Sequence, residues 1–290
     1  MQTYILTSGA LLVLLSACGA TVPDATPDPD PVPDPVTPPS YETLDSTADA
    51  TSILGGTIIE RERITAGPLV STAGELVHNT GRTTINVNEG AHIIVDPDGV
   101  DENGQITDGT ATINVDSMSS NYDYARVYFI QYGPNEFFAT AVGGIVTHED
   151  HMPTAGTGTY TGEAEARIRY ISGNDPRRVF LENGTSRVDV DFASGSVDVT
   201  MNNFTSDEPS PIDTILIYDM TLSGNAFAGG TIITTNQGEE INVTGDNSVA
   251  FAGGNFFGYD DAISGPDEVA GVFDDRGDNY LKVKGHFMAD

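Results

Sequence analysis

The sequence is poor in basic side chains. Its 290 residues include 12 Lys and Arg against 43 Asp and Glu, which gives a formal net charge of -31. Phosphate backbones and bare anionic lipid surfaces repel a protein with this charge, so no nucleic-acid partner is predicted. The acidic excess is typical of a strongly solvated surface, and attraction to a cationic partner is the alternative.

Cysteine is almost absent and tryptophan is entirely absent. The single cysteine, Cys18, excludes an intramolecular disulfide, so the fold must be stabilised by packing, for which the chain is long enough. The sequence also lacks a nucleophile elbow, a phosphate-binding glycine loop and a metalloprotease helix. We therefore predict that the protein is not an enzyme, and we assign it no catalytic residue, no metal and no cofactor.

The N-terminus carries an apolar run, residues 10–15, that is too short to cross a bilayer and is followed by small residues. We predict that residues 1–17 are an export signal peptide. The tetrapeptide that ends at Cys18, LSAC, resembles the lipobox of bacterial lipoproteins. This resemblance implies that the Cys18 thiol takes a diacylglycerol and anchors the mature chain to a lipid bilayer, at roughly 0.8 kcal/mol per buried methylene.

Residues 18–50 form a second segment without Lys or Arg, and residues 23–39 alternate proline with aspartate. Proline fixes φ and removes hydrogen-bond donors, while the like charges repel one another. The pattern predicts an extended tether, whose 17 proline-rich residues reach on the order of 50 Å at about 3.1 Å each. A plain disordered linker is the alternative, and it would separate the folded part from the lipid in the same way.

Residues 51–150 contain short alternating runs separated by turn residues, with no helical period. Five runs are predicted to be strands: 52–59, 82–87, 91–95, 110–115 and 124–132. The dipeptides Asp98-Gly99, Asn103-Gly104 and Asp108-Gly109 are predicted to form turns between them. We interpret this region as a β-rich domain.

Residues 151–290 show a more regular pattern. In the stretch 152–171, the even positions from Gly158 to Tyr170 are small or apolar, and the odd positions are Thr, Glu or Arg. A period of two is typical of a strand with one buried and one solvated face. Small residues beside large ones on the inner face favour a closed or strongly curved sheet.

The alternation continues to the C-terminus. Further strands are predicted at 187–192, 197–201, 212–222, 227–234, 247–257 and 268–273. In the last strand Val283, Gly285 and Phe287 are expected inside, and Lys282, Lys284 and His286 outside. Eight or nine strands joined by short turns, without a crossover helix, predict an antiparallel up-and-down barrel.

The segment MPTAGTGTYTG, which starts at Met152, resembles the start of the barrel domain in the transferrin-binding protein B superfamily. The segments VDVDFASGSVDVTM, FAGGNFFGYDDAISGPDEVAGVF and YLKVKGHF resemble later parts of that barrel, in the same order. The superfamily also includes factor H binding protein and the haem-capturing hemophilins. The resemblance implies an all-β fold in which a handle domain, residues 51–150, precedes an eight-stranded barrel, residues 151–290. This sequence holds one such unit, whereas transferrin-binding protein B has two lobes, so the ligand stays open.

The resemblance and the lipobox together imply a lipoprotein of the outer membrane that faces the cell exterior and binds a ligand non-covalently. An iron-carrying protein or haem is the implied ligand class. The alternative is a structural or adhesive envelope lipoprotein without a nutrient ligand. We interpret the stretch 152–171 as structural and expect ligand contacts in the residues before it and in loops at the barrel ends. The contact residues and the oligomeric state are not predicted.

Four neighbouring residues, His148, Glu149, Asp150 and His151, form the densest group of metal-type ligands. They miss the zinc protease pattern because Met152 stands where the second histidine is required. Two adjacent histidines without further fixed ligands do not define a coordination geometry. We interpret the group as a polar connection between domains, with a haem or metal role as the alternative.

Three other segments carry weaker signals. The acidic residues 96–108 suit calcium by composition, but placing Gly104 at the sixth position of an EF-hand loop puts Gly99 where an aspartate is required. A surface turn is therefore expected. Arg276-Gly277-Asp278 spells an adhesive tripeptide and is interpreted as an ordinary turn. The tyrosines are expected to pack in a sheet, with an interface role as the alternative. They are Tyr122, Tyr124, Tyr128 and Tyr132.

Overall fold

The computed structural model describes part of the chain. It covers residues 41, 43–44, 54–62, 70–72, 76–79, 82–87, 91–95, 105–108, 111–132, 137–244, 249–277 and 282–290. The predicted signal peptide, Cys18, residues 18–40, 42 and 45–50 of the tether, and the turns at Asp98-Gly99 and Asn103-Gly104 lie outside these residues and stay predictions. The described residues contain no helical segment with the length and hydrophobicity of a membrane span.

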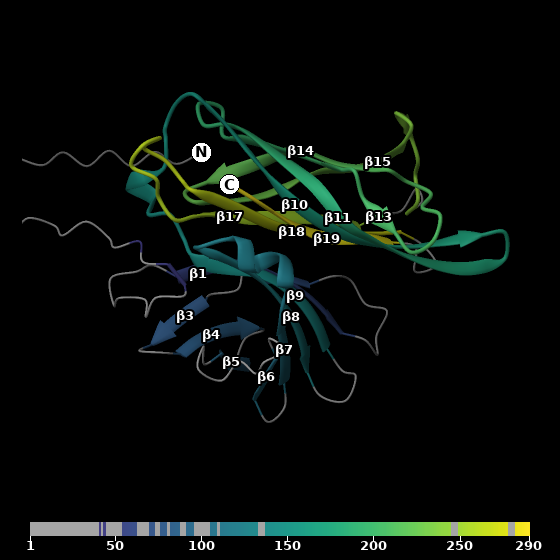
Figure 1. Ribbon diagram of the computed structural model, residues 1–290, viewed down its shortest axis with the longest axis horizontal. Coiled ribbons are helices and arrows are strands. Elements are labelled where there is room, and N and C mark those ends of the chain that lie inside the picture. The colour runs from purple at the N-terminus through teal and green to yellow at the C-terminus, as the bar shows by residue number, and fades with distance from the viewer. Residues whose placement is uncertain are drawn as a thin grey trace, which may run out of the picture. The chain divides into compact units, whose positions relative to one another are not determined.

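The N-terminal strands form two antiparallel sheets, which we call the handle (Figure 1). The six-stranded sheet has the order β2-β1-β9-β8-β7-β6, and the three-stranded sheet has the order β3-β4-β5. The bounds are β1 Leu54–Glu62, β2 Val70–Thr72, β3 Leu76–Asn79, β4 Arg82–Val87, β5 Ala91–Val95, β6 Gln105–Asp108, β7 Ala111–Val115, β8 Ala125–Tyr132 and β9 Phe137–Ile145. There are two short 3-10 helices: η2 Ser117–Asn121 lies between β7 and β8, and η3 Glu149–His151 follows β9.

All five strands predicted in this region are present, and β4 and β5 have the predicted bounds. The sequence did not predict β2, β3, β6 or β9. The first three are three or four residues long, which is too short to show a period. Strand β9 shows no alternation because both of its faces are covered from Ala141 to Ile145.

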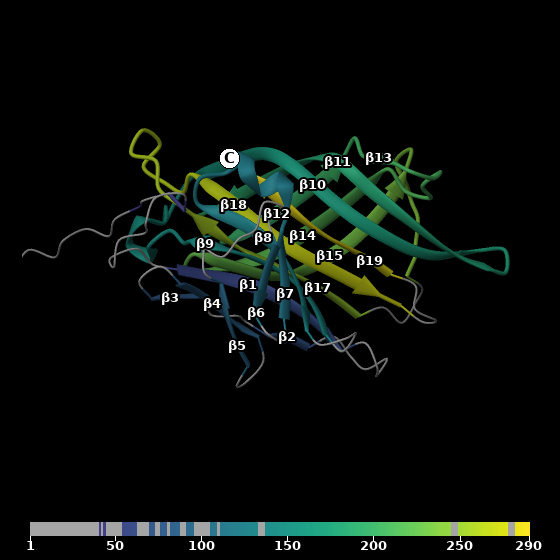
Figure 2. The ribbon, with the colours of Figure 1, turned by 60° about the horizontal axis from the view of Figure 1, so that its bottom comes forward.

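The C-terminal strands close into a barrel (Figures 1 and 2). Their order is β10-β19-β18-β17-β15-β14-β12-β11, and β10 also pairs with β11, so eight strands form a complete ring. The bounds are β10 Thr157–Ser172, β11 Asp175–Asp191, β12 Ser196–Asn202, β14 Thr214–Ser223, β15 Ala226–Asn236, β17 Val249–Phe257, β18 Glu268–Arg276 and β19 Lys282–Ala289. Two-residue strands β13 Thr205–Ser206 and β16 Glu239–Glu240 lie beside β11 and β15. The closed up-and-down barrel predicted from the sequence is confirmed.

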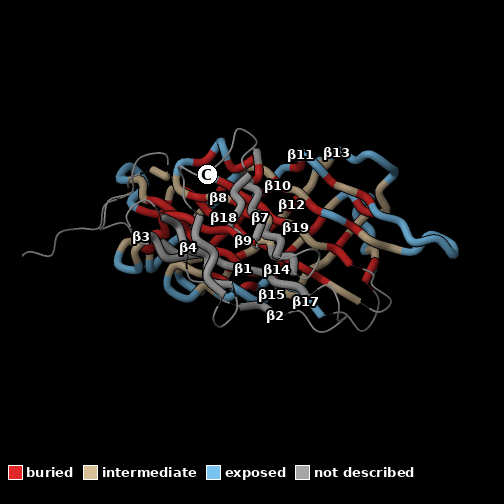
Figure 3. The backbone as a smooth tube through the Cα atoms, turned by 90° about the horizontal axis from the view of Figure 1, so that it is seen from below, coloured by how far each residue is buried: buried red, intermediate tan, exposed pale blue. Residues whose placement is uncertain are grey.

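Buried residues, red in Figure 3, recur along the barrel strands, and they are largely those that the sequence pattern assigned to the interior. On β10 the even positions Tyr160, Ala164, Ala166 and Ile168 are buried. The centre holds four almost fully buried phenylalanines, Phe227, Phe256, Phe273 and Phe287. Their rings and the aliphatic side chains around them form one continuous core.

The outer face of β17–β19 is buried as well, which differs from the sequence expectation. His286 is 3% exposed and Lys282 is 8% exposed, although both were expected to face solvent. The handle covers His286, which lies 3.2 Å from Asp116, and a second apolar cluster joins handle residues to the outer face of the barrel. Its buried members are Met118, Tyr122, Ala125, Val127, Val142, Val146, Phe257, Ala270, Val272 and Met288. The alternation of inner and outer residues in the sequence does not distinguish an outer face exposed to solvent from an outer face covered by another sheet.

Glu268 connects the barrel to the handle through polar contacts. Its carboxylate accepts backbone N–H groups of Asp123 at 2.5 Å, Tyr124 at 3.1 Å and Ala125 at 2.9 Å. Burial raises the pKa of Glu268 to about 7, although the three N–H groups lower it. Handle and barrel lie in one unit, residues 39–290, and the domain boundary expected near residue 150 stays a prediction.

Candidate functional site

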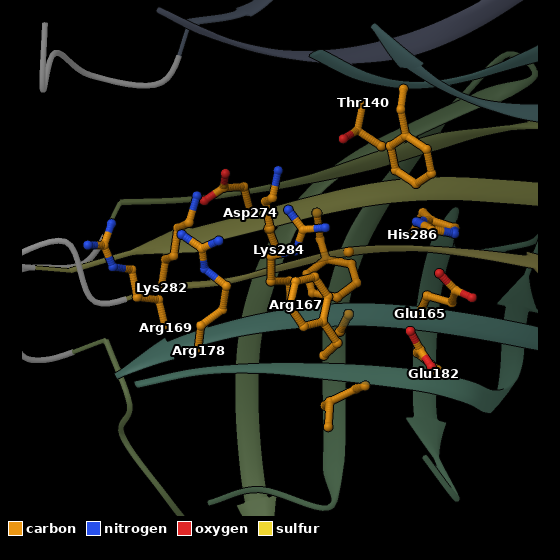
Figure 4. Close-up of a pocket in the computed structure, with 16 residues that line it drawn as sticks. Thr140, Glu165, Arg167, Arg169, Arg178, Glu182, Asp274, Lys282, Lys284 and His286 are labelled. Atoms are coloured by element: carbon orange, nitrogen blue, oxygen red, sulfur yellow. The ribbon is translucent and has the colours of Figure 1, made fainter. Parts of the chain in front are cut away.

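A pocket of about 580 Å³ lies between the outer wall of the barrel and handle strands β8 and β9 (Figure 4). The volume lies within the range typical of ligand sites. Barrel strands β10, β11, β18 and β19 supply most of its lining, and the handle contributes Phe129 and Thr140. The pocket is therefore built from the face of β10 that carries the odd-numbered, charged residues.

Among the residues that the structure describes, five of the chain's twelve basic residues line this pocket. We call them the basic patch: Arg167, Arg169, Arg178, Lys282 and Lys284. Figure 4 shows them gathered in one part of the pocket together with Asp274, whereas Thr140, Glu165, Glu182 and His286 occupy the other part. A local excess of positive charge in a protein of net charge -31 indicates an environment that differs from the rest of the surface.

The strand register places like charges opposite one another in the basic patch. Arg167 pairs with Lys284 and Arg169 with Lys282 across β10 and β19, and Arg169 pairs with Arg178 across β10 and β11. Like charges directly opposite each other destabilise a sheet. Asp274, opposite Lys284, supplies one negative charge. Burial and the charge of Arg178 lower the pKa of Arg167. An anion bound here would relieve this repulsion.

Aromatic side chains give the pocket an apolar wall. Phe129 and Phe180 line it from outside the barrel, and the core residues Phe273 and Leu181 close it from the barrel side. The guanidinium of Arg167 lies 4.4 Å from the centre of the Phe180 ring, a cation–π contact that fixes the arginine against the wall. The pocket therefore presents apolar surface beside concentrated positive charge.

The opposite part of the pocket carries acids and a histidine. Glu165 on β10 and His286 on β19 are register partners and line the pocket, and His286 lies 3.2 Å from Asp116 of the handle. Burial alone raises the pKa of Asp116. His286 and the Met118 N–H have a larger combined effect in the opposite direction, so the pKa of Asp116 lies below its ordinary value. Burial and the charge of Asp116 raise the pKa of Glu165.

The predicted histidine group lies elsewhere and has structural contacts. His148 caps η3, where its Nδ1 accepts the Asp150 N–H at 3.2 Å. His151 Nδ1 is 2.8 Å from the Tyr41 hydroxyl, and the His151 ring lies 4.6 Å from the Tyr259 ring. Both histidines therefore help to hold Tyr41 and the chain connection in place, and neither lines the pocket.

The remaining candidates also have structural surroundings. Tyr122 and Tyr128 are buried, and burial raises the pKa of Tyr128 to about 12. Tyr124 is half-buried against the barrel. Packing within the sheet therefore holds for Tyr128 on β8, whereas Tyr122 and Tyr124 precede that strand and pack between the handle and the barrel. Of the adhesive tripeptide, Arg276 ends β18, and Asp278 lies outside the described residues. Within residues 96–108, only 105–108 are described, as strand β6.

Sequence reasoning missed the residues of the pocket because it assigned them to a wet barrel wall. Glu165, Arg167 and Arg169 belong to the stretch interpreted as purely structural. The available signal was the distribution of scarce charge: basic residues concentrate in 167–178 and 282–284 of an otherwise acidic chain.

The architecture places the chain in a class of all-β proteins in which a handle packs on a closed eight-stranded barrel. Residues 152–290 match the protein family described as C-lobe and N-lobe beta barrels of Tf-binding protein B. The chain therefore carries a barrel of the transferrin-binding protein B type, and the resemblance seen in the sequence is confirmed. No curated protein matches the chain.

Three solved structures of transferrin-binding protein B share the fold. The intact protein designated Ap-TbpB, with both lobes, matches 84% of this chain and 47% of its own at 19% identity and a TM-score of 0.50. The isotype 1 protein of serogroup B Neisseria meningitidis matches 82% of this chain and 43% of its own, at 18% identity and a TM-score of 0.50. A double mutant of the protein from Haemophilus parasuis Hp5 matches 82% of this chain and 44% of its own, at 17% identity and a TM-score of 0.52. These identities establish a likeness of fold alone, and this chain spans less than half the length of each relative.

Proposed function

We propose that the protein is a lipid-anchored binding protein of the outer membrane that faces the cell exterior, captures a ligand non-covalently in the handle–barrel pocket and catalyses no reaction. The basic patch carries the proposal, because it sets opposed like charges beside an apolar wall in a strongly acidic protein. The transferrin-binding protein B barrel and the lipobox-like LSAC segment support the binding role and the anchor.

The pocket chemistry favours a ligand that presents an acidic group next to apolar surface. An iron-carrying protein meets this requirement through a carboxylate side chain flanked by apolar residues. Haem meets it with two carboxylates on a flat apolar ring, and a pocket of about 580 Å³ is large enough to receive such a group. Both ligands belong to iron acquisition, so we propose this role for the protein, with the transferrin-binding name of the relatives as support.

Reversing two charges of the basic patch is expected to abolish ligand capture. In the mature chain, residues 18–290 with Cys18→Ser, the double variant Arg169→Glu, Lys282→Glu should bind at least about 100-fold more weakly, because two attractive charge contacts become repulsive. Binding is measured by affinity capture from iron-limited, serum-supplemented medium and by the absorbance change on adding hemin. Arg187→Glu is the matched control, because Arg187 is exposed on β11 and pairs with Asp189 at 2.7 Å, outside the pocket.

Two results would contradict the proposal. Equal capture by wild type and the double variant would exclude the basic patch as the binding surface. Recovery of no iron-carrying protein, together with no spectral change on adding hemin, would exclude the iron role and favour the structural or adhesive alternative.

Replacing Cys18 with serine is expected to release the protein from the membrane, because the thiol is the proposed attachment point of the acyl chains. The variant should lose metabolic labelling with palmitate and appear in the soluble fraction. Protease treatment of intact cells should degrade the wild-type protein if it faces the exterior. Continued labelling of the serine variant would rule out Cys18 as the lipid site, and resistance to protease would contradict surface display.

A further inference from the structure

The acidic part of the pocket brings three metal-type ligands together from three separate segments. Asp116 precedes η2 in the handle, Glu165 lies on β10 and His286 lies on β19. One ligand atom from each residue lies within 4.8 Å of the others. Asp116 and His286 are both buried, and Glu165 is partly buried.

The contact between Asp116 and His286 does not have the geometry of a hydrogen bond. The Oδ2–Nε2 distance is 3.2 Å, yet Nε2 of this 3% exposed imidazole has no hydrogen-bond partner among the described residues. The carboxylate oxygen therefore lies away from the axis along which Nε2 donates or accepts. Two ligands of one tetrahedral metal ion, each at about 2.1 Å, are separated by about 3.4 Å, and each points at the metal and not at the other ligand.

We propose that Asp116, Glu165 and His286 bind one first-row divalent metal ion at the handle–barrel junction, in a site of the zinc type. Two carboxylates and an imidazole suit Zn²⁺, Mn²⁺ and Fe²⁺, whereas Ca²⁺ prefers a larger set of oxygen ligands alone. Glu165 and His286 also line the pocket, so an open coordination position can be reached by water or by an incoming ligand.

The surroundings hold the ligands in position. Asp116 Oδ1 accepts the Met118 N–H at 2.9 Å, which fixes the carboxylate and leaves Oδ2 toward His286. The Phe129 ring contacts the His286 ring edge-on with the centroids 5.5 Å apart, which limits rotation of the imidazole. Such supporting contacts are typical of metal sites. Because Asp116 belongs to the handle and the other two ligands to the barrel, the metal would connect the two.

The alternative is a buried ion pair of Asp116 and His286 without a metal. A simple ion pair needs neither Glu165 nor an off-axis geometry. Substitution of Glu165 therefore distinguishes a metal site from an ion pair. This proposal does not rest on the proposed ligand capture, because the basic patch occupies the other part of the pocket and includes none of the three residues (Figure 4).

The test uses the mature chain, residues 18–290 with Cys18→Ser, which also removes the only thiol. Metal-free protein is titrated with Zn²⁺ in competition with a chromophoric chelator, and one tightly bound Zn²⁺ per chain is expected. Glu165→Gln should weaken this binding by roughly 100-fold or more, as should His286→Gln. Glu182→Gln is the matched control: it removes the same charge from the same pocket at a residue outside the ligand group, and should change the affinity less than about threefold.

Thermal unfolding supplies a second readout that does not depend on the chelator. A Zn²⁺ excess should raise the unfolding temperature of the wild type by roughly 5–10 °C, and that of Glu165→Gln far less. Absence of stoichiometric binding, or equal affinity of wild type and Glu165→Gln, would overturn the proposal in favour of the ion pair. Binding that is lost in His148→Gln but kept in Glu165→Gln would overturn it in favour of a surface histidine site.

Discussion

Replacing Glu268 with alanine is expected to loosen the handle from the barrel before the barrel itself unfolds. The substitution leaves the N–H groups of Asp123, Tyr124 and Ala125 without their acceptor in a buried junction. Burying polar groups without partners costs about 1–3 kcal/mol each, and water entry offsets part of that, so we expect a loss of about 2–4 kcal/mol. Hydrogen exchange of amides near residues 123–129 should become roughly 30-fold to 1000-fold faster, because opening is governed by the local free energy.

The control for this prediction removes another carboxylate at the same junction. Glu163 reaches Asn121 Nδ2 at 3.4–3.5 Å, and that contact is long and exposed. Glu163→Ala should therefore change the free energy of unfolding by less than about 0.5 kcal/mol. If both alanine variants showed wild-type exchange rates near residues 123–129, Glu268 would not be the group that holds the handle.

The elevated pKa of Glu268 gives the same junction a pH dependence of known sign. Because burial raises its pKa in the folded state from 4.5 to about 7, the folded protein binds this proton more tightly than the unfolded chain. The resulting stabilisation is fully present below about pH 4.5 and is lost as the pH rises through about 7. The free energy of unfolding should fall by roughly 3 kcal/mol over this range. Glu268→Gln should flatten this part of the stability profile, measured by urea unfolding at pH 5 and pH 8.

The sequence predicted the barrel well because the barrel interior imposes a strict constraint on it. On β10, small and apolar residues alternate with Thr, Glu or Arg from Thr157 to Tyr170, so a one-residue shift would bury Glu and Arg. The closed barrel also followed, because consecutive strands joined by short turns, without a crossover helix, favour an up-and-down barrel. The handle was predicted less completely, since β2, β3 and β6 are short and β9 lacks alternation.

The pocket could not be predicted because it depends on contacts between segments far apart in the chain. Asp116, Glu165 and His286 have no common spacing, and only the docking of η2 onto β10 and β19 brings them together. His148 and His151, three residues apart in the sequence, are a candidate that spacing alone can find, but they support Tyr41. A rule based on spacing finds sites within one segment and misses those made by packing two layers.

The second large effect is expected from removing the aromatic ring at the centre of the barrel. Phe287 is fully buried, and its ring lies over Gly271 of the neighbouring strand, where an added Cβ would come within 2.4 Å of the ring. Phe287→Ala removes this filling and leaves a cavity, which costs about 3–5 kcal/mol. Urea unfolding should show this loss as a lower free energy of unfolding, with an unchanged dependence of that free energy on urea concentration. As a control, Ile171→Ala at the exposed hairpin tip should change the free energy of unfolding by less than about 0.5 kcal/mol.

A double-mutant cycle tests whether the ring and the glycine depend on each other. Gly271→Ala alone should destabilise the protein, because its new methyl group collides with the Phe287 ring. In the Phe287→Ala background that collision disappears and the methyl group occupies part of the cavity, so the double variant should be less destabilised than the sum of the two single variants. A difference of at least about 1 kcal/mol is expected. Strict additivity would show that the ring does not lie over Gly271, and that the small residue is required there for the nearby backbone of Gly253 alone.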